Sequence, residues 1–213
     1  MAIAAALKAA GAEVPYGFES HALLIFIKLK RELMSKIIVM VGPSGVGKDA
    51  VLEEVKKEIN LTSVVSATTR DPREGEVDTE DYYFVSKNMF ENSIKENHFI
   101  EYCEVHGNYY GTPKQSINSH INNNEDVALV LDVYGFEKLK KVFPEAYGIF
   151  LSPPSLEVLR ERLEFRNTDA MSVITKRIDK ATEEIEKSLT LDFSLRLIND
   201  NLEETVKTIV AKI

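Results

Sequence analysis

The feature that most constrains this chain is a glycine-rich turn between an apolar run and a helical pattern, at residues 37–57, IIVMVGPSGVGKDAVLEEVKK. Ile37–Val41 is short, apolar and mostly β-branched, which is typical of a strand buried on both faces of a parallel sheet. After the turn, apolar residues recur at helical spacing and give a helix one face to pack on that sheet. They are Val51, Leu52, Val55 and Ile59. Strand, turn and helix in this order predict an α/β fold.

The turn itself matches the phosphate-loop pattern G-x-x-x-x-G-K. Its glycines allow backbone angles closed to other residues, so successive N–H groups can point at anionic oxygens at the start of the helix. Lys48 adds a point charge for the β- and γ-phosphates of ATP. The next residue is Asp49, where such loops usually have a Ser or Thr that holds Mg²⁺. The predicted ATP-binding residues of the loop are Gly42, Pro43, Ser44, Gly45, Val46, Gly47, Lys48 and Asp49.

The composition fits one globular domain with small-molecule substrates. The chain has 213 residues, 44% of them hydrophobic, which is enough for a sizeable core. Its net charge of −8 argues against a general partner role with nucleic acid or acidic membranes. The single cysteine, Cys103, excludes an internal disulfide and suits a reducing compartment, so we expect a cytoplasmic protein. One cysteine and four scattered histidines predict no metal-ligand cluster.

Residues 1–33 differ from the rest and are interpreted as an N-terminal extension of unknown role. Residues 2–12 are alanine-rich, and Ala22–Leu29 is far shorter than the roughly 20 apolar residues that cross a bilayer. We therefore expect no membrane span there. Vector-derived sequence, an over-extended start before Met34 and a surface helix all remain open for this segment, and residues 34–213 are expected to form the functional domain.

A charged segment follows the first helix. Residues 63–67 form a β-rich run that leads into TTRDPREGEVDTEDYYF. Arg70 and Arg73 flank Pro72 in a stretch too rich in turn formers for a helix, so both guanidinium groups can converge on one anion. A solvated charged loop is the alternative interpretation. A helix is expected over residues 88–96, before the stretch FIEYCEVHGNYYGTP.

Three more apolar runs predict strands, at Val127–Leu131, Gly148–Leu151 and Leu195–Ile198. Helical stripes follow the last two strands. Their apolar positions are Leu156, Leu159 and Leu163, then Ile174, Ile178, Ala181 and Ile185, and finally Leu202, Val206, Ile209 and Ile213.

Taken in order, the segments GPSGVGK, SATTRDPREGEVDTEDYYF, FIEYCEVHGNYYGTP, PPSLEVLRERL and LIND resemble guanylate kinase, the family that phosphorylates GMP with ATP. The resemblance implies a P-loop fold, with a parallel sheet flanked by helices, a small mixed insertion that binds the monophosphate, and a helical lid. ATP, GMP and the Mg²⁺ that accompanies ATP are the implied ligands. The implied division is a core at residues 34–64, 118–159 and 178–213, a GMP-binding insertion at 65–117 and a lid at 160–177.

The resemblance also assigns the GMP site. Glu101 falls where the family holds guanine, and a carboxylate can accept both the N1–H and the 2-amino donors of that base. Adenine would present a lone pair to the carboxylate instead, and a site built for hydrogen bonds rejects such an analogue. Ser66 and Thr112 are assigned to the same base. The remaining residues assigned to GMP are Arg70, Arg73, Glu76, Tyr82, Tyr110 and Asp132.

On the ATP side, the resemblance assigns catalytic roles to Lys48 and to three lid arginines, Arg162, Arg166 and Arg177. These cations would neutralise the transferring phosphoryl group. Asn199 is assigned a place against the adenine.

Several positions depart from the family pattern. Asp132 follows an apolar strand, where an acid near Mg²⁺ is common in P-loop proteins, and Asp49 is the other acid expected near the ion. A helix-capping role is the alternative for Asp132. Val130 and Tyr134 replace an acid and a glutamine of the family around it. Phe165, together with the residue at 167, replaces lid glycines and predicts a stiffer hinge.

Two other interpretations remain open from the sequence. Ribose 1,5-bisphosphate phosphokinase has a similar fold and characteristically carries Gly-Lys-Asp in its phosphate loop, as this chain does. It is not expected to carry the TTRDPREGE and HGNYYGTP segments. Guanylate-kinase-like scaffold modules bind peptides without catalysis, but they have typically lost the ATP loop that is present here.

Overall fold

The structure is a computed structural model that describes residues 35–105, 107–165 and 170–213. The predicted extension, residues 1–33, and the predicted lid residue Arg166 lie outside the described residues.

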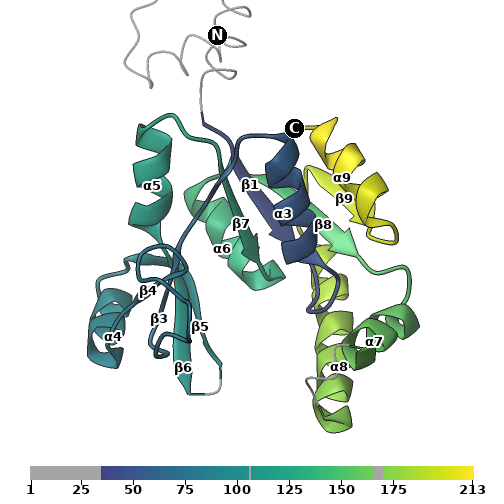
Figure 1. The fold of residues 1–213 in the computed structure, drawn as a ribbon, viewed down its shortest axis with the longest axis horizontal. Coiled ribbons are helices and arrows are strands. Elements are labelled where there is room, and N and C mark those ends of the chain that lie inside the picture. Colours follow the sequence, from purple (N-terminus) through teal and green to yellow (C-terminus); the bar gives the residue numbers. More distant parts are fainter. Residues whose placement is uncertain (1–34, 106, 166–169) are drawn as a thin grey trace, which may run out of the picture. The chain divides into compact units, whose positions relative to one another are not determined.

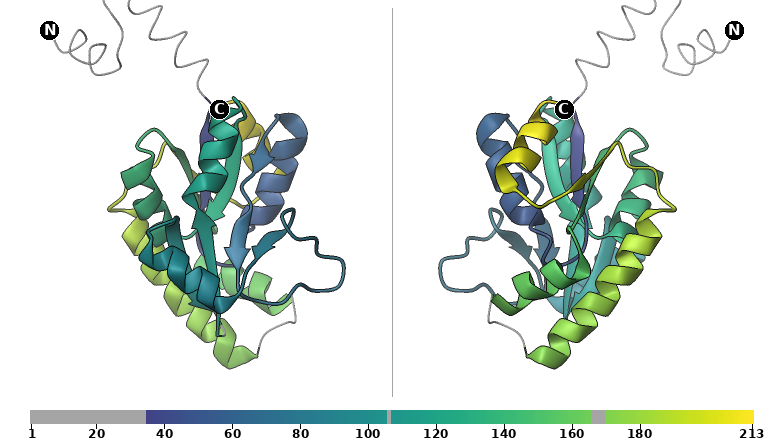
Figure 2. Two further views of the ribbon diagram at one scale, coloured as in Figure 1. Left: turned by 90° about the vertical axis from the view of Figure 1, so that its left-hand side faces the viewer. Right: turned by 90° about the vertical axis from the view of Figure 1, so that its right-hand side faces the viewer.

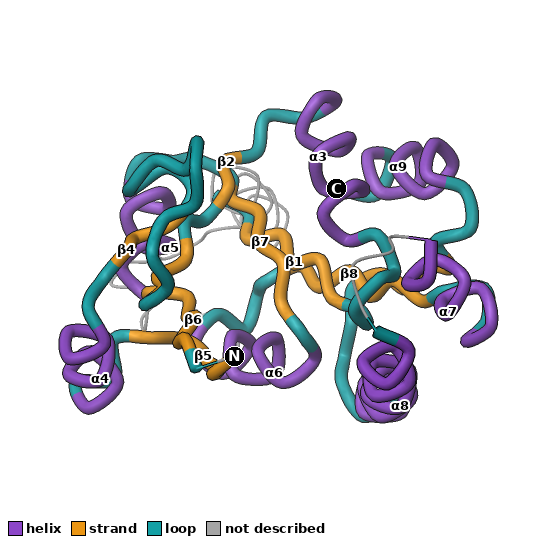
Figure 3. The backbone as a smooth tube through the Cα atoms, turned by 60° about the horizontal axis from the view of Figure 1, so that its bottom comes forward, coloured by secondary structure: helices purple, strands orange, loops and turns teal. Residues whose placement is uncertain are grey.

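The core is a parallel sheet with the strand order β2-β7-β1-β8-β9 (Figure 3). Each neighbouring pair runs parallel, and Ile37 of β1 is in register with Val127 of β7. The central position of β1 agrees with its uninterrupted apolar sequence. The strands are β1 Ile37–Val41, β2 Thr62–Ser63, β7 Val127–Leu131, β8 Tyr147–Ser152 and β9 Leu195–Ile198.

Helices cover both faces of this sheet (Figure 2). Ile38 and Met40 of β1 pack on one side against α3, Lys48–Glu58, and α9, Leu202–Val210. Ile37, Val39 and Val41 point to the other side because side chains alternate along a strand. There they meet three helices: α5 Lys114–Asn122, α6 Val133–Val142 and α8 Met171–Ser188.

A second, mixed sheet has the order β4-β3-β6-β5. β3 runs parallel to β4 and antiparallel to β6, and β5 pairs antiparallel with β6. Its strands are β3 Ser66–Thr68, β4 Tyr82–Phe84, β5 Phe99–Val105 and β6 Asn108–Pro113. Helix α4, Lys87–Lys95, packs on this sheet through Phe90, whose ring stacks on Phe99 and Tyr109 at 4.3 and 5.3 Å between centroids.

The β-rich run expected at residues 63–67 is divided between two strands in the structure. These strands belong to different sheets, because β2 pairs with β7 and β3 pairs with β4 and β6. The sequence shows β propensity there but cannot show with which strand each residue pairs. The strands predicted at 127–131 and 195–198 are confirmed, and the helix predicted at 88–96 lies at 87–95.

Helix α7, Leu156–Phe165, packs on α8 through a small core of Leu159, Leu163, Ile174 and Ile178. In Figure 1 the second sheet with α4 lies at the lower left and α7 with α8 at the lower right, both beyond the carboxyl ends of β1 and β7. Ligands of parallel α/β sheets bind at this end of the strands. No helix among the described residues is both long enough and apolar enough to span a membrane.

Candidate functional site

The loop between β1 and α3 has the backbone expected of a phosphate loop. Gly45 and Gly47 have φ angles of 91° and 98°, in the left-handed region that favours glycine. Gly47 is the N-cap of α3 and offers no side chain to the first N–H groups of that helix. The N-terminus of α3 can therefore direct these N–H groups and the positive end of its dipole toward an anion.

Lys48 is folded back over this loop. Its Nζ donates to the carbonyl oxygens of Gly42 at 2.6 Å and of Pro43 at 3.1 Å. Burial lowers the pKa of Lys48, and the nearby carboxylates of Glu184, Asp49 and Asp132 oppose that shift. The ammonium group is thus held by carbonyl oxygens that phosphate oxygens can replace.

A cavity of about 520 Å³ opens beside the loop, lined by its glycines, by residues of α7 and by Asn199. The side-chain Nδ2 of Asn199 donates to Val46 O at 2.8 Å, and its backbone N–H donates to Ser152 O at 2.8 Å. Arg162 Nη1 donates to Asn199 O at 2.9 Å. The Oδ1 atom of Asn199 is buried and accepts no hydrogen bond from the described residues. Two predicted ATP-site residues, Asn199 and Arg162, therefore lie together at this cavity.

Three predicted guanine-site residues lie on adjacent strands of the second sheet. Ala67 pairs with Gly111 and Glu101 pairs with Thr112, so this register places Ser66 opposite Thr112. Residues directly opposite each other share a face of the sheet. Thr112 Oγ1 donates to Glu101 Oε1 at 2.8 Å.

Burial raises the pKa of Glu101, the hydrogen bond from Thr112 opposes this, and the charge of Asp132 raises it further. Asp132 lies close by: a Cβ added to Gly135 would be 3.1 Å from Glu101 Cγ and 3.4 Å from Asp132 Oδ1. Asp132 is also the N-cap of α6, because its Oδ1 accepts from Gly135 N at 2.7 Å. The capping role left open by the sequence is therefore present. Asp132 directly follows Leu131, which pairs with Val41 at the end of β1, so it lies near both the guanine-site acid and the start of the phosphate loop.

The expected convergence of the Arg70 and Arg73 guanidinium groups on one anion is not seen among the described residues: Glu76 binds the guanidinium of Arg70 but only the backbone of Arg73. The two Nη atoms of Arg70 donate to the two carboxylate oxygens of Glu76 at 2.9 and 2.8 Å, and Arg73 contributes its backbone N–H at 2.7 Å. These bonds raise the pKa of Arg70 and lower that of Glu76. The Arg73 side chain is exposed.

Aromatic rings complete this corner of the second sheet. The Arg70 guanidinium lies 5.6 Å from the ring centroid of Tyr82, and Tyr82 meets Tyr110 edge-on at 6.1 Å. Four of the residues predicted to bind GMP are thereby brought together: Arg70, Glu76, Tyr82 and Tyr110.

Glu184 on α8 is a charged residue near the site that the sequence reasoning missed. It is only 4% exposed and lies 3.4 Å from Lys180. Burial raises its pKa, while the charges of Lys180 and Lys48 lower it. The available signal was its place three residues after Ala181 on the predicted apolar stripe, where a carboxylate is out of keeping. Arg177 lies on the same helix, about two turns earlier.

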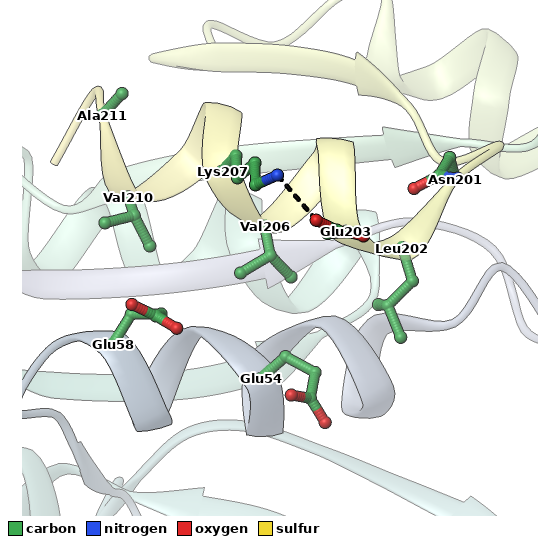
Figure 4. A pocket seen from close by; sticks show the side chains of 9 residues that line it. All are labelled: Glu54, Glu58, Asn201, Leu202, Glu203, Val206, Lys207, Val210 and Ala211. Carbon is green, nitrogen blue, oxygen red and sulfur yellow. Dashed lines mark hydrogen bonds and ion pairs between the residues drawn. The ribbon is translucent and has the colours of Figure 1, made fainter.

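A second cavity, of about 670 Å³, lies between α3 and α9 (Figure 4). Glu54, Glu58 and Glu203 line it, and its one lysine, Lys207, pairs with Glu203 at 2.6 Å. None of the predicted site residues lines this cavity. Its carboxylates would repel phosphate, so the cavity beside the glycine loop is the better nucleotide site.

Comparisons with known proteins agree with the geometry. The guanylate kinase family model matches residues 34–213. The chain is 43% identical over 176 residues to a guanylate kinase of Prochlorococcus marinus, a match that covers 82% of this chain and 95% of the relative. A guanylate kinase of Gloeobacter violaceus is 44% identical over 177 residues, covering 83% and 85%. The crystal structure of guanylate kinase from Anaplasma phagocytophilum superposes with a TM-score of 0.62 at 30% identity and covers 84% of each chain.

Proposed function

This chain belongs to the guanylate kinase family, and from that premise we propose which of its residues carry out the transfer of the γ-phosphoryl group of ATP to GMP. The two other interpretations of the sequence, a ribose 1,5-bisphosphate phosphokinase and a non-catalytic module, give way to this family. One observation carries the proposal. Asp132 directly follows Leu131, which pairs with Val41 just before the glycine loop, and it lies beside Glu101 at Gly135, so the acceptor and donor sites meet around it.

The donor site is the glycine loop. The phosphates of ATP take the N–H groups at the start of α3, and Lys48 exchanges the carbonyl oxygens of Gly42 and Pro43 for phosphate oxygens. Arg162, held against Asn199, brings a second cation to the same side. Arg177, with Arg166 beyond the described residues, adds to the positive charge.

The acceptor site is on the second sheet. Glu101, fixed by Thr112, accepts the N1–H and 2-amino donors of guanine, and the hydroxyl of Ser66 donates to O6. Burial disfavours the charged form of this carboxyl, and hydrogen bonds from guanine favour it, so base binding and ionisation support each other.

The GMP phosphate binds near Arg70, which Glu76 and Tyr82 hold in a fixed orientation. The hydroxyl groups of Tyr82 and Tyr110 serve as donors, and the exposed Arg73 side chain supplies charge that is not used by Glu76.

The transfer itself needs no general base. A phosphate monoester has a second pKa of about 6, so GMP is mostly dianionic at neutral pH and already nucleophilic. The residues contribute positioning and neutralisation of charge in the transition state. Lys48, Arg162 and Arg177 carry this role among the described residues.

Mg²⁺ enters with ATP. It needs only one or two carboxylates besides phosphate oxygens and water, and when bound it neutralises charge on the β- and γ-phosphates. Asp49 and Asp132 are the fitting residues, because Asp49 follows Lys48 in the first turn of α3 and Asp132 follows the β7 residue that pairs with Val41, just before the loop. Asp132 keeps one oxygen on the α6 cap, and its other oxygen would be available to help hold the ion.

We place the reaction in the cytoplasm. A single, exposed cysteine is compatible with a reducing compartment, and ATP and GMP are intracellular metabolites.

A coupled assay of ADP formation tests the proposal, with GMP, AMP and ribose 1,5-bisphosphate offered in turn. GMP is expected to be the preferred acceptor by a wide margin. Equal or faster turnover with either of the other two acceptors would refute the guanine site on the second sheet.

A further inference from the structure

One wall of the cavity beside the glycine loop contains an aromatic residue that has no role in the mechanism above. This wall is formed by Glu161, Arg162 and Phe165 of α7. Residues three and four apart lie on one face of a helix, so these side chains belong together. Leu159 and Leu163 lie on the other side of α7 and are buried against α8.

Phe165 is the unusual member of this wall. Its side chain is 92% exposed, the highest value among the large hydrophobic residues of the described chain. A single exposed apolar side chain is ordinary on a protein surface. This one also lines a cavity whose opposite wall is the phosphate loop.

The position of Phe165 relative to the loop is fixed by close packing. A Cβ added to Gly45 would lie 2.7 Å from Leu163 Cδ2 and 3.2 Å from Leu159 Cδ1, so α7 rests directly on the loop backbone. Arg162, one turn before Phe165, is tied to Asn199, and Asn199 is tied to Val46 of the loop. The helix that carries Phe165 is therefore held in place against the loop.

The chemistry of the cavity fits a purine base. A nucleotide whose phosphates lie on the loop must extend its base away from the N-terminus of α3, and the cavity begins there, at Gly45 and Gly47. Its volume of about 520 Å³ is in the range of small-molecule sites. Phe165 lines this cavity together with the polar residues Arg162 and Asn199. An exposed aromatic ring in such a lining is a platform for a flat heterocycle.

We propose that Phe165 stacks on the adenine of ATP and sets the affinity for the donor base. The inference rests on the proposed function, because it takes the donor phosphates to lie on the glycine loop. Loss of one base–aromatic stack is expected to weaken binding roughly 5- to 150-fold. The effect concerns the base alone, so ligands without a base should not respond.

The chain contains no tryptophan, so F165W introduces a single indole reporter at the site. Its emission should be quenched in a saturable manner by MgADP. Inorganic tripolyphosphate, which can occupy the loop but has no base, should compete with ADP without quenching by itself. Equal quenching by both ligands, or by neither, would overturn the stacking.

Affinity measurements by calorimetry complete the test. F165A should bind MgADP roughly 5- to 150-fold more weakly than the wild type, with unchanged affinity for tripolyphosphate and unchanged KM for GMP. F165Y should retain the affinity. M171A is the matched control, since Met171 is 61% exposed at the start of α8 and does not line the cavity.

One contrary result is that F165A binds ADP as tightly as the wild type does, while the wild type binds both ADP and tripolyphosphate. That result would overturn the role of Phe165 but not the donor site on the loop. Failure of the wild type to bind either ligand would overturn the donor site on the loop, and the stacking with it.

Discussion

Replacement of Glu101 by Gln probes the guanine site with little change of shape. Glu101 Oε1 accepts from Thr112 at 2.8 Å, a bond that the amide oxygen of E101Q can keep. The second oxygen becomes an NH₂ group that faces a guanine donor. Losing a hydrogen bond to a charged group costs about 1.5–3 kcal/mol. We therefore expect kcat/KM for GMP to fall roughly 10- to 100-fold, while KM for ATP hardly changes and discrimination against AMP shrinks.

The same substitution should stabilise the fold. Burial raises the folded-state pKa of Glu101 above its ordinary 4.5, so the folded protein binds this proton more tightly than the unfolded chain. The resulting stability is present at low pH and is lost as the pH rises from about 4.5 through the raised pKa. At neutral pH the wild type therefore holds a destabilising buried charge that E101Q lacks. We expect the Tm of E101Q to exceed that of the wild type at pH 7 and to approach it at acidic pH.

The kinetics use the coupled assay at saturating ATP, and Tm is measured by calorimetry without nucleotide. E104Q is the matched control: Glu104 is exposed on the same strand, three positions along, and so points to the opposite face. Wild-type GMP kinetics and intact exclusion of AMP in E101Q would refute the assignment of guanine to Glu101. A loss in E104Q instead would transfer the role to Glu104.

Three further substitutions test the loop and its surroundings. K48A should abolish turnover but leave GMP binding by calorimetry nearly intact, because Lys48 contacts only the donor phosphates; normal turnover would contradict the loop assignment. G42A should lower the free energy of unfolding in urea by more than the roughly 1–3 kcal/mol of backbone strain alone, since its Cβ would overlap Leu151 O. G75A is its control, with a φ of 89° and open space around the Cβ, and equal losses in both variants would show that the overlap is relieved. E184Q removes the charge that most strongly raises the pKa of Lys48, so the alkaline limb of kcat/KM for ATP should move to lower pH. The control is E183Q, in which the exposed neighbour is changed and the alkaline limb should not move. An unmoved limb in E184Q as well would show that Glu184 does not raise the pKa of Lys48.

The elements around the glycine loop could be predicted because their signals are local. An apolar β-branched run, glycines at fixed spacing and an amphipathic helix each depend on a few neighbouring residues, and β1 and α3 lie where these patterns place them. The partner of a strand in a sheet, in contrast, is not determined by neighbouring residues in the sequence. The β-rich run at residues 63–67 therefore gave no sign that β2 and β3 belong to different sheets.

The same distinction between local and non-local signals applies to the site residues. Charge spacing predicted that the guanidinium groups of Arg70 and Arg73 share an anion, but in the folded turn Glu76 binds only the Arg70 guanidinium and takes the backbone N–H of Arg73. Glu184 was hidden on an apolar stripe because a helical pattern gives the direction of a side chain without its neighbours. Phe165 appeared only as a departure in the lid, since its nearness to the loop depends on the packing of Leu163 against Gly45.

The contacts that build the two substrate sites join residues separated by very different lengths of chain. Glu101 and Thr112 are 11 residues apart in one antiparallel pair, whereas the hydrogen bond from Asn199 to Val46 joins residues 153 apart. Loop-closure entropy grows as about (3/2)RT ln n, so the donor-side contact costs roughly 2 kcal/mol more chain entropy than the guanine-side contact. Non-local pairings of this kind also slow folding. The contact between Glu101 and Thr112 thus forms within the single hairpin β5–β6. The contacts on the adenine side form only after β1 and β9 have joined the same sheet.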